Sequence, residues 1–283
     1  MMRCRHHWLA LASLCALAGC EDRSEPKAKP HPVVIATPAT PVLPVSPPRM
    51  DREALLLAVT QVASEAAMGV VDEERQRQLD GSRFELRLRF GCPNQPGSDE
   101  DPPRSWNLDE KRRVLSWRIA PEMSGDDLPV QALGERTYEA VEGFWIHRPW
   151  LLKAACPAVR VAPSSPPNPP QAVDGALRGQ APAITPPYVG IAQFFTETDA
   201  RTHRRDKRAY TATNAIGTGE TPSADGYDLV ISGRLRRLDS GRVIACDAEY
   251  ATRPPRCIIS AQFDSVAIET PGTGEVIAKW SSS

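Results

Sequence analysis

The chain has 283 residues, with 34 Lys and Arg against 35 Asp and Glu, and its formal net charge is −1. This balance excludes the protein-wide basic footprint of a nucleic-acid-binding protein. The length is sufficient for two modest hydrophobic cores. Proline is concentrated, with eight of 28 residues between Pro26 and Pro48 and nine between Pro157 and Pro187. These two proline-rich stretches divide the chain into candidate domains.

The first twenty residues have the pattern of an export signal. Arg3 and Arg5 precede a short apolar run, Trp8–Ala18, which is too short to span a bilayer as a helix. The run ends in Leu-Ala-Gly-Cys, with the cysteine at Cys20, and is similar to the lipobox of bacterial lipoproteins. The resemblance implies cleavage of residues 1–19 and lipid attachment at Cys20, so that the protein is anchored in the cell envelope and faces the periplasm. Glu21 is more similar to an outer-membrane sorting signal than to an inner-membrane one. The alternatives are an ordinary signal peptide that is cut nearby, or a chance apolar stretch.

The remaining cysteines predict disulfides. Cys4 and Cys15 would leave with the signal, and Cys20 would carry the lipid, so four remain: Cys92, Cys156, Cys246 and Cys257. An even number in an exported protein favours two disulfides, because the periplasm is oxidising. Four cysteines allow three connectivities. If each candidate domain closes its own bridge, the pairs are Cys92–Cys156 and Cys246–Cys257. The absence of a Cys-x-x-Cys pair argues against a metal site.

A proline-rich tether and a helix are predicted to come first. Residues 20–49 lack an amphipathic period and form an extended tether, which is either a spacer or a flexible leader. A helix is expected over 52–79, because Asp51 is a good N-cap and Gly81 lies just past the end. Its apolar face is spaced at three- and four-residue steps: Leu55, Val59, Val62, Ala66 and Val70.

Strands follow the helix and complete a predicted α+β domain over residues 50–157. The segment Arg83–Phe90 alternates apolar and charged residues, which predicts a half-buried strand. Its arginines allow an anion-binding ladder, but Glu85 interrupts them, and a solvated face is favoured. Further strands are expected over 106–108, 114–119 and 138–147. One helix over three or four antiparallel strands is an α+β unit.

Residues 158–187 are a predicted linker, and residues 188–283 a mainly antiparallel β module. Strands are expected over 189–195, 227–235, 242–246, 257–263, 266–269 and 276–280. The strands over 242–246 and 257–263 flank a loop with Pro254 and Pro255, and a hairpin between them would place Cys246 opposite Cys257. The strands over 266–269 and 276–280 flank the turn sequence of residues 271–274 and predict a second hairpin. Residues 200–214 are expected to form a short helix or a loop. The predicted fold class is therefore α+β, with an N-terminal helix on a small antiparallel sheet and a separate β-rich module.

Local catalytic motifs are missing from the sequence. It contains no Gly-x-Ser-x-Gly, no His-Glu-x-x-His and no phosphate-binding loop, and it suggests neither a cofactor nor a metal site. His147 lies in the aromatic segment Phe144–Trp150. This segment is either a binding patch with a proton-transfer group or, as favoured, a strand end whose aromatic rings fill the core.

One basic cluster is a possible anion-binding site: Arg201, Arg204, Arg205, Lys207 and Arg208. It could contact anionic lipid, a glycan or an acidic envelope partner. The favoured alternative is a solvated loop that is partly neutralised by neighbouring carboxylates.

Two function classes remain. The main hypothesis is a membrane-anchored envelope lipoprotein with a non-enzymatic binding or scaffolding role. The alternative is a periplasmic hydrolase without a recognisable local motif. A cleft with clustered carboxylates, or His147 beside an acidic residue, would favour the hydrolase. An exposed apolar or arginine-rich face would favour binding.

Overall fold

The computed structural model describes residues 49–92, 102–125, 130, 138–156, 189–199, 204–248 and 254–281. All of them belong to one compact unit, residues 46–283. Cys20, the predicted tether up to residue 48 and the predicted linker lie outside the described residues, as do Arg201 and His203.

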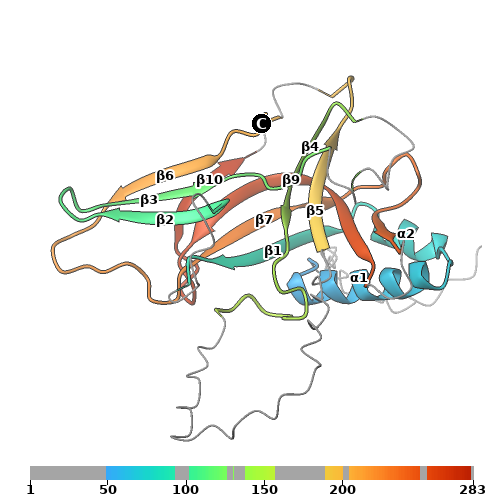
Figure 1. The fold of residues 1–283 in the computed structure, drawn as a ribbon, viewed down its shortest axis with the longest axis horizontal. Coiled ribbons are helices and arrows are strands. Elements are labelled where there is room, and N and C mark those ends of the chain that lie inside the picture. Colours follow the sequence, from blue (N-terminus) through green and yellow to red (C-terminus); the bar gives the residue numbers. More distant parts are fainter. Residues whose placement is uncertain are drawn as a thin grey trace, which may run out of the picture. The chain divides into compact units, whose positions relative to one another are not determined.

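Within these ranges the chain forms two helices and ten strands (Figure 1). The helices are α1 (Arg52–Ala67) and α2 (Glu73–Leu79). The first five strands are β1 (Arg83–Phe90), β2 (Arg104–Asp109), β3 (Val114–Ile119), β4 (Ala140–Trp145) and β5 (Val189–Phe195). The others are β6 (Tyr210–Ala215), β7 (Tyr227–Leu235), β8 (Ile244–Asp247), β9 (Arg256–Glu269) and β10 (Val276–Ser281).

The prediction of a single helix over 52–79 is wrong, because α1 ends at Ala67 and a second helix begins at Glu73. Gly69 has a φ of 70°, the left-handed conformation that commonly ends helices. Asp72 then starts α2 as its N-cap, and its side chain accepts a hydrogen bond from the Arg75 N–H at 3.0 Å. A glycine followed three residues later by a capping aspartate therefore divides the segment.

The strands form two sheets (Figure 1). The seven-stranded sheet has the order β1-β7-β9-β5-β4, and β8 and β10 also pair with β9. The β5–β9 pair is parallel, and the other pairs of this sheet are antiparallel. The three-stranded antiparallel sheet has the order β2-β3-β6.

The predicted α+β class, with two separate modules, is therefore wrong. The fold is mainly β, and strands from the two predicted modules share both sheets: β1 pairs with β7, β4 with β5 and β3 with β6. Alternating hydrophobicity shows which side chains of a strand are buried, but it does not identify the neighbouring strand. The sequence pattern therefore predicted many strands correctly and assigned them to the wrong sheets.

The helices cover part of the large sheet. Helix α1 packs against β1, β8 and β9 and buries Leu55, Leu56, Val59 and Val62. Helix α2 is fixed by the fully buried Gln76 side chain. Its Oε1 accepts hydrogen bonds from the N–H groups of Val243 and Ile244, at 2.7 and 3.1 Å, and its Nε2 donates to Ile244 O at 3.0 Å. The Gln76 amide thus forms hydrogen bonds with backbone groups at the edge of β8 that faces away from β9.

Two disulfides close the unit. Cys92, just after β1, is bonded to Cys156, and Cys246 of β8 is bonded to Cys257 of β9. The second pair lies directly opposite across the antiparallel strands. These are the two pairings expected if each candidate domain closes its own bridge, and the predicted hairpin between the two cysteines is confirmed.

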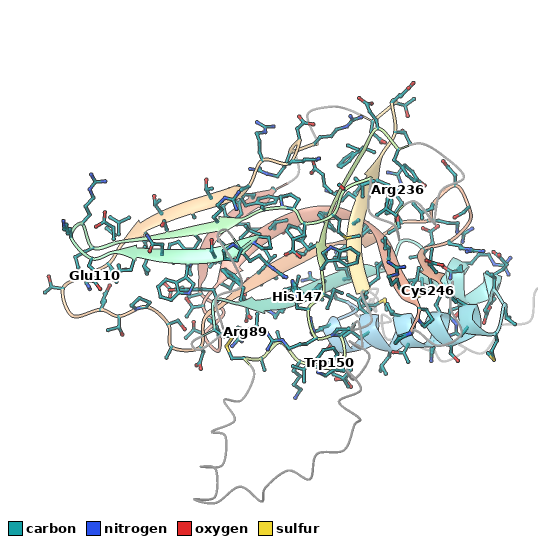
Figure 2. All side chains as sticks on the ribbon, viewed as in Figure 1. Arg89, Glu110, His147, Trp150, Arg236 and Cys246 are labelled. Carbon is teal, nitrogen blue, oxygen red and sulfur yellow. A yellow bond between two sulfur atoms is a disulfide. The ribbon has the colours of Figure 1, made fainter. Side chains whose placement is uncertain are left out.

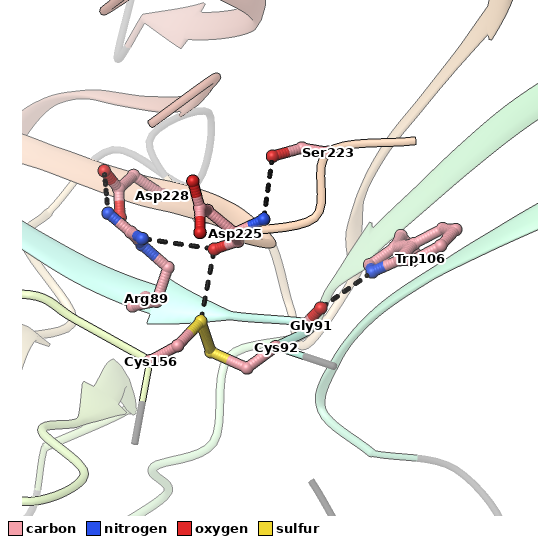
Figure 3. Close-up of a disulfide and its surroundings, with 8 residues drawn as sticks. All are labelled: Arg89, Gly91, Cys92, Trp106, Cys156, Ser223, Asp225 and Asp228. Carbon is pink, nitrogen blue, oxygen red and sulfur yellow. Dashed lines mark hydrogen bonds and ion pairs between the residues drawn. A yellow bond between two sulfur atoms is a disulfide. The ribbon is translucent and has the colours of Figure 1, made fainter. Parts of the chain in front are cut away.

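The surroundings of the first disulfide are tightly packed (Figure 3). The indole N–H of Trp106 donates to Gly91 O at 3.1 Å, and Gly91 has a φ of 65°. A Cβ atom at Gly91 would lie 2.3 Å from Trp106 Cδ1. Only glycine therefore fits between the end of β1 and this ring.

Candidate functional site

A small cavity with a basic lining lies where the start of α1 meets β1 and the loop of residues 146–156. Its volume is about 20 Å³. None of the residues that line it is acidic. Six of them carry basic side chains: Arg52, Arg89, Arg104, His147, Arg148 and Lys153. Figure 2 labels Arg89, His147 and Trp150 in this region, near the N-terminal end of α1. We call this space the basic cavity.

Arg52 holds the loop that forms one wall of the basic cavity. Asp51 caps α1 by accepting a hydrogen bond from Ala54 N–H at 2.9 Å, and this places Arg52 on the buried side of the first turn. The guanidinium donates to four backbone carbonyls, those of Leu151 at 2.9 Å, His147 and Arg148 at 3.2 Å, and Arg87 at 3.3 Å.

These partners are neutral, so the charge of Arg52 is not neutralised by a carboxylate. Burial, together with the neighbouring charges of Arg104 and Arg148, lowers the pKa of Arg52 to about 10. The lowered pKa means that the folded site disfavours the positive charge. An anion at the site would relieve this repulsion.

Arg104 and Glu122 form a buried ion pair beside Arg52. Arg104 Nε lies 2.8 Å from Glu122 Oε1, and their side chains are only 5 and 6% exposed. The other carboxylate oxygen accepts from Trp145 N–H at 3.3 Å and lies 3.4 Å from His147 Nε2. Burial lowers the pKa of Arg104, Glu122 opposes this shift, and Arg148 adds to it. The Glu122 carboxylate thus contacts Arg104, His147 and the Trp145 N–H group.

Arg148 retains an unused donor. Its backbone has a φ of 54°, an uncommon left-handed conformation for a non-glycine residue. Its Nη1 atom is buried and has no hydrogen-bond partner among the described residues. Since buried guanidinium nitrogens are normally hydrogen-bonded, this atom is a candidate donor for a ligand oxygen.

A larger groove adjoins the basic cavity and shares Arg52, Arg89, Lys153 and Ala154 with it. Its volume is about 640 Å³. Three of its four arginines are paired with carboxylates: Arg49 with Glu85, Arg87 with Glu85 and Glu269, and Arg89 with Asp228. Arg87 and Arg89 of β1 are therefore neutralised by ion pairs, whereas Arg52, which lines both spaces, is held by backbone carbonyls.

The predicted basic cluster of residues 201–208 lies elsewhere, and none of its described members lines the basic cavity. Arg204 is buried, pairs with Glu139 at 2.8 Å and lies over the Phe195 ring. Arg205 lies 4.0 Å from the centre of the Tyr210 ring. Lys207 and Arg208 are exposed. The two arginines with these internal contacts have little freedom to contact a ligand.

The buried Glu142 side chain holds the turn at Arg205 and Asp206 through hydrogen bonds. Its Oε1 accepts hydrogen bonds from the N–H groups of Arg205 and Asp206, at 2.8 and 2.7 Å. Burial raises the pKa of Glu142, although these two hydrogen bonds oppose the shift. Burial also raises the pKa of Tyr210 to about 12. The structure thus gives this turn a network of internal contacts.

Sequence analysis identified His147 and the segment around it, which contains Arg148, but it missed Arg52, Arg104 and Glu122. Arg52 had a detectable signal, because it precedes Leu55 by three residues on the apolar face of α1. A charged residue at such a position is normally paired or functional. Arg104 and Glu122 lie in separate segments that only the folded chain brings together.

Comparison with known proteins finds no matching family model, no similar curated protein and no similar solved structure. In the part of the chain that the structure describes, neither helix has the length and apolar character needed to cross a membrane. The same residues contain no group of three or more His, Cys, Asp or Glu side chains placed to hold a metal ion.

Proposed function

We propose that this protein is a lipid-anchored protein of the bacterial cell envelope that binds the anionic group of another envelope component and catalyses no reaction. The observation that carries the binding role is the basic cavity, which is lined by six basic residues; one of them, Arg148, has a buried Nη1 atom without a hydrogen-bond partner among the described residues. The pattern of residues 1–20 supports the anchor, and the two disulfides fit an oxidising compartment.

The cavity favours an anion because Arg52 and Arg104 are already buried and fixed in place. Backbone carbonyls hold Arg52, and Glu122 and Trp145 O hold Arg104. Preorganised donors lose little conformational entropy when a ligand arrives. An anionic oxygen would also offset the mutual repulsion of the three guanidinium groups, which the lowered pKa of Arg52 reflects.

The size of the cavity limits what can enter. A water molecule needs about 10–15 Å³, and the cavity has about 20 Å³. We therefore propose that one oxygen of a phosphate or carboxylate group enters the cavity while the rest of the ligand lies in the adjoining groove. The mixed charges of that groove suit a polar ligand.

The first test measures anion binding by residues 21–283, the chain without the predicted signal peptide and the lipidated cysteine. Titration with inorganic phosphate, followed by calorimetry or by amide NMR shifts, should give saturable binding. Arg148→Gln should weaken it at least about tenfold, because it removes a charge-assisted hydrogen bond of about 1.5–3 kcal/mol.

Lys207→Gln is the matched control, since it removes the same charge from an exposed position outside the cavity. Its affinity should remain within about twofold of the unmodified chain at physiological salt, where distant exposed charges are screened. Equal affinities for the Arg148→Gln variant and the unmodified chain would contradict a site in the basic cavity. A larger effect of Lys207→Gln would place binding in the cluster of residues 201–208.

The second test concerns the anchor. Mass spectrometry of protein purified from membranes should show that the mature chain begins at Cys20 and carries lipid. Cys20→Ser should leave the precursor uncleaved or release the protein from the membrane. Extraction of the unmodified protein should require detergent, because two or more acyl chains anchor firmly. An unmodified N-terminus at another residue would rule out lipidation at Cys20.

One observation favours the alternative, a periplasmic hydrolase: His147 Nε2 lies 3.4 Å from Glu122 Oε2. A histidine oriented by a carboxylate is a common general base. Here, however, Glu122 is already paired with buried Arg104. Turnover of chromogenic ester or glycoside substrates that is lost in His147→Ala would favour this alternative over a binding role.

A further inference from the structure

The loop of residues 146–156 presents two large apolar side chains to solvent. Trp150 is 59% exposed and Leu152 is 39% exposed. Trp150 is the only aromatic residue among the exposed large hydrophobic residues of the described chain, and the others are aliphatic. Burying an exposed indole ring against a partner is energetically favourable, which is why tryptophan is frequent in binding sites.

The loop is held firmly in this position. Arg52 donates to the carbonyls of His147, Arg148 and Leu151, and Leu151 N–H donates to Arg148 O at 2.9 Å. The disulfide from Cys156 to Cys92 fixes the end of the loop to the end of β1 (Figure 3). A side chain on a fixed backbone can bind at a low cost in conformational entropy.

Two basic residues flank the exposed pair in the sequence. Arg148 and Lys153 are close neighbours in the sequence, and both line the basic cavity. Asp51 and Glu53 are exposed at the start of α1 and line the adjoining groove, so the surface is not uniformly positive. The arrangement thus combines an exposed indole, an exposed leucine and a basic cavity with an unused donor.

The chain enters the compact unit at the same place. Arg49, where the described residues begin, lines the same groove as Leu152 and Lys153. If Cys20 carries a lipid, the described unit is attached to it through Arg49, which lines the same groove as Leu152. This junction favours a membrane surface, rather than a soluble protein, as the partner of the loop.

We infer that the loop of residues 146–156 docks on an anionic bilayer, with Trp150 and Leu152 at the level of the lipid headgroups and one phosphate oxygen of a lipid in the basic cavity. Tryptophan rings are favoured at membrane–water interfaces, and basic residues near the surface are attracted to anionic lipids. This inference rests on the proposed function, because it assigns the anion of the basic cavity to a lipid phosphate.

The experiment uses residues 21–283 and vesicles of phosphatidylglycerol and phosphatidylethanolamine, with phosphatidylcholine vesicles as the neutral comparison. The protein should sediment with the anionic vesicles, less at high salt, and its tryptophan fluorescence should shift to shorter wavelength. Trp150→Ser with Leu152→Ser should reduce partitioning at least about tenfold, and Arg148→Gln should reduce it as well.

Val276→Ser is the matched control, because Val276 is also exposed but lies at the start of β10. It should leave partitioning unchanged, and unchanged thermal midpoints should show that all variants are folded. Equal partitioning of the double variant and the unmodified chain, or equal binding to neutral and anionic vesicles, would overturn the inference. Phosphate binding without vesicle binding would overturn it and leave the proposed anion-binding function intact, whereas loss of both would overturn both.

Discussion

Replacing Arg52 with methionine should lower the free energy of unfolding by about 3–5 kcal/mol. The substitution removes the donor for four carbonyl groups, those of Arg87, His147, Arg148 and Leu151. Each buried acceptor that loses its partner costs about 1–3 kcal/mol. Water reaching part of the loop and relief of the repulsion from Arg104 and Arg148 would offset a fraction of the loss. Urea unfolding followed by circular dichroism measures the change.

Arg49→Met is the matched control, because it removes an arginine from the same groove. Arg49 forms an exposed ion pair with Glu85, with side-chain exposures of 52 and 27%. Such pairs contribute about 0–1 kcal/mol, so this variant should unfold almost as the unmodified chain does. If the two variants lose equal stability, the four carbonyl contacts of Arg52 do not hold the loop.

Removing the disulfide between Cys92 and Cys156 should cost about 4 kcal/mol in the chain-entropy model, because the two residues are separated by 64 positions. The bridge between Cys246 and Cys257 closes a separation of only 11 positions and should contribute about 3 kcal/mol. The double alanine variants of each pair should therefore rank in this order in urea unfolding. Peptide mapping without reduction checks the two pairings directly.

The two double variants also differ in where their effects should appear. Without the Cys92–Cys156 bond, the end of the loop of residues 146–156 is free, so phosphate binding should weaken together with stability. The Cys246–Cys257 bond lies within the β8–β9 pair, and its loss should leave phosphate affinity unchanged. A larger loss of stability from the short bridge would show that the closed-loop length does not determine the order.

Strand positions could be predicted from the sequence where the local pattern was strong. The ranges 83–90, 114–119, 189–195 and 227–235 coincide with β1, β3, β5 and β7. Each combines apolar residues with strict alternation or forms a buried apolar run, and both patterns depend only on neighbouring residues. Local chemistry is sufficient for this level of the fold.

The pairing of the strands could not be predicted in the same way. Residues 257–263 and 266–269 were expected as two strands. They form one strand, β9, because its register against β7 shifts between Ser232 and Gly233, which leaves Asp264 unpaired as a bulge. The bulge depends on a partner strand some thirty residues earlier, and no local pattern contains that information.

In the candidate site, too, some residues could be recognised from their local sequence and others only from the folded chain. His147 belongs to a conspicuous aromatic segment, so the sequence drew attention to it. Arg104 and Glu122 are ordinary charged residues in their local context, and their importance arises from burial beside Arg52. Burial of a charge can be predicted only when the covering segments are known, and those segments are α1, β2 and the loop of residues 146–156.

The position of β9 in the sheet has a consequence for biosynthesis. Its strand order, β1-β7-β9-β5-β4, means that β9 alone joins the β1–β7 pair to the β4–β5 pair. Because β9 begins only at Arg256, nearly the whole chain must leave the ribosome before the two halves of the sheet can combine. Until then each half has open strand edges, which readily pair with other chains. A nascent or truncated chain that ends before Arg256 is therefore the form most dependent on chaperones and most exposed to aggregation.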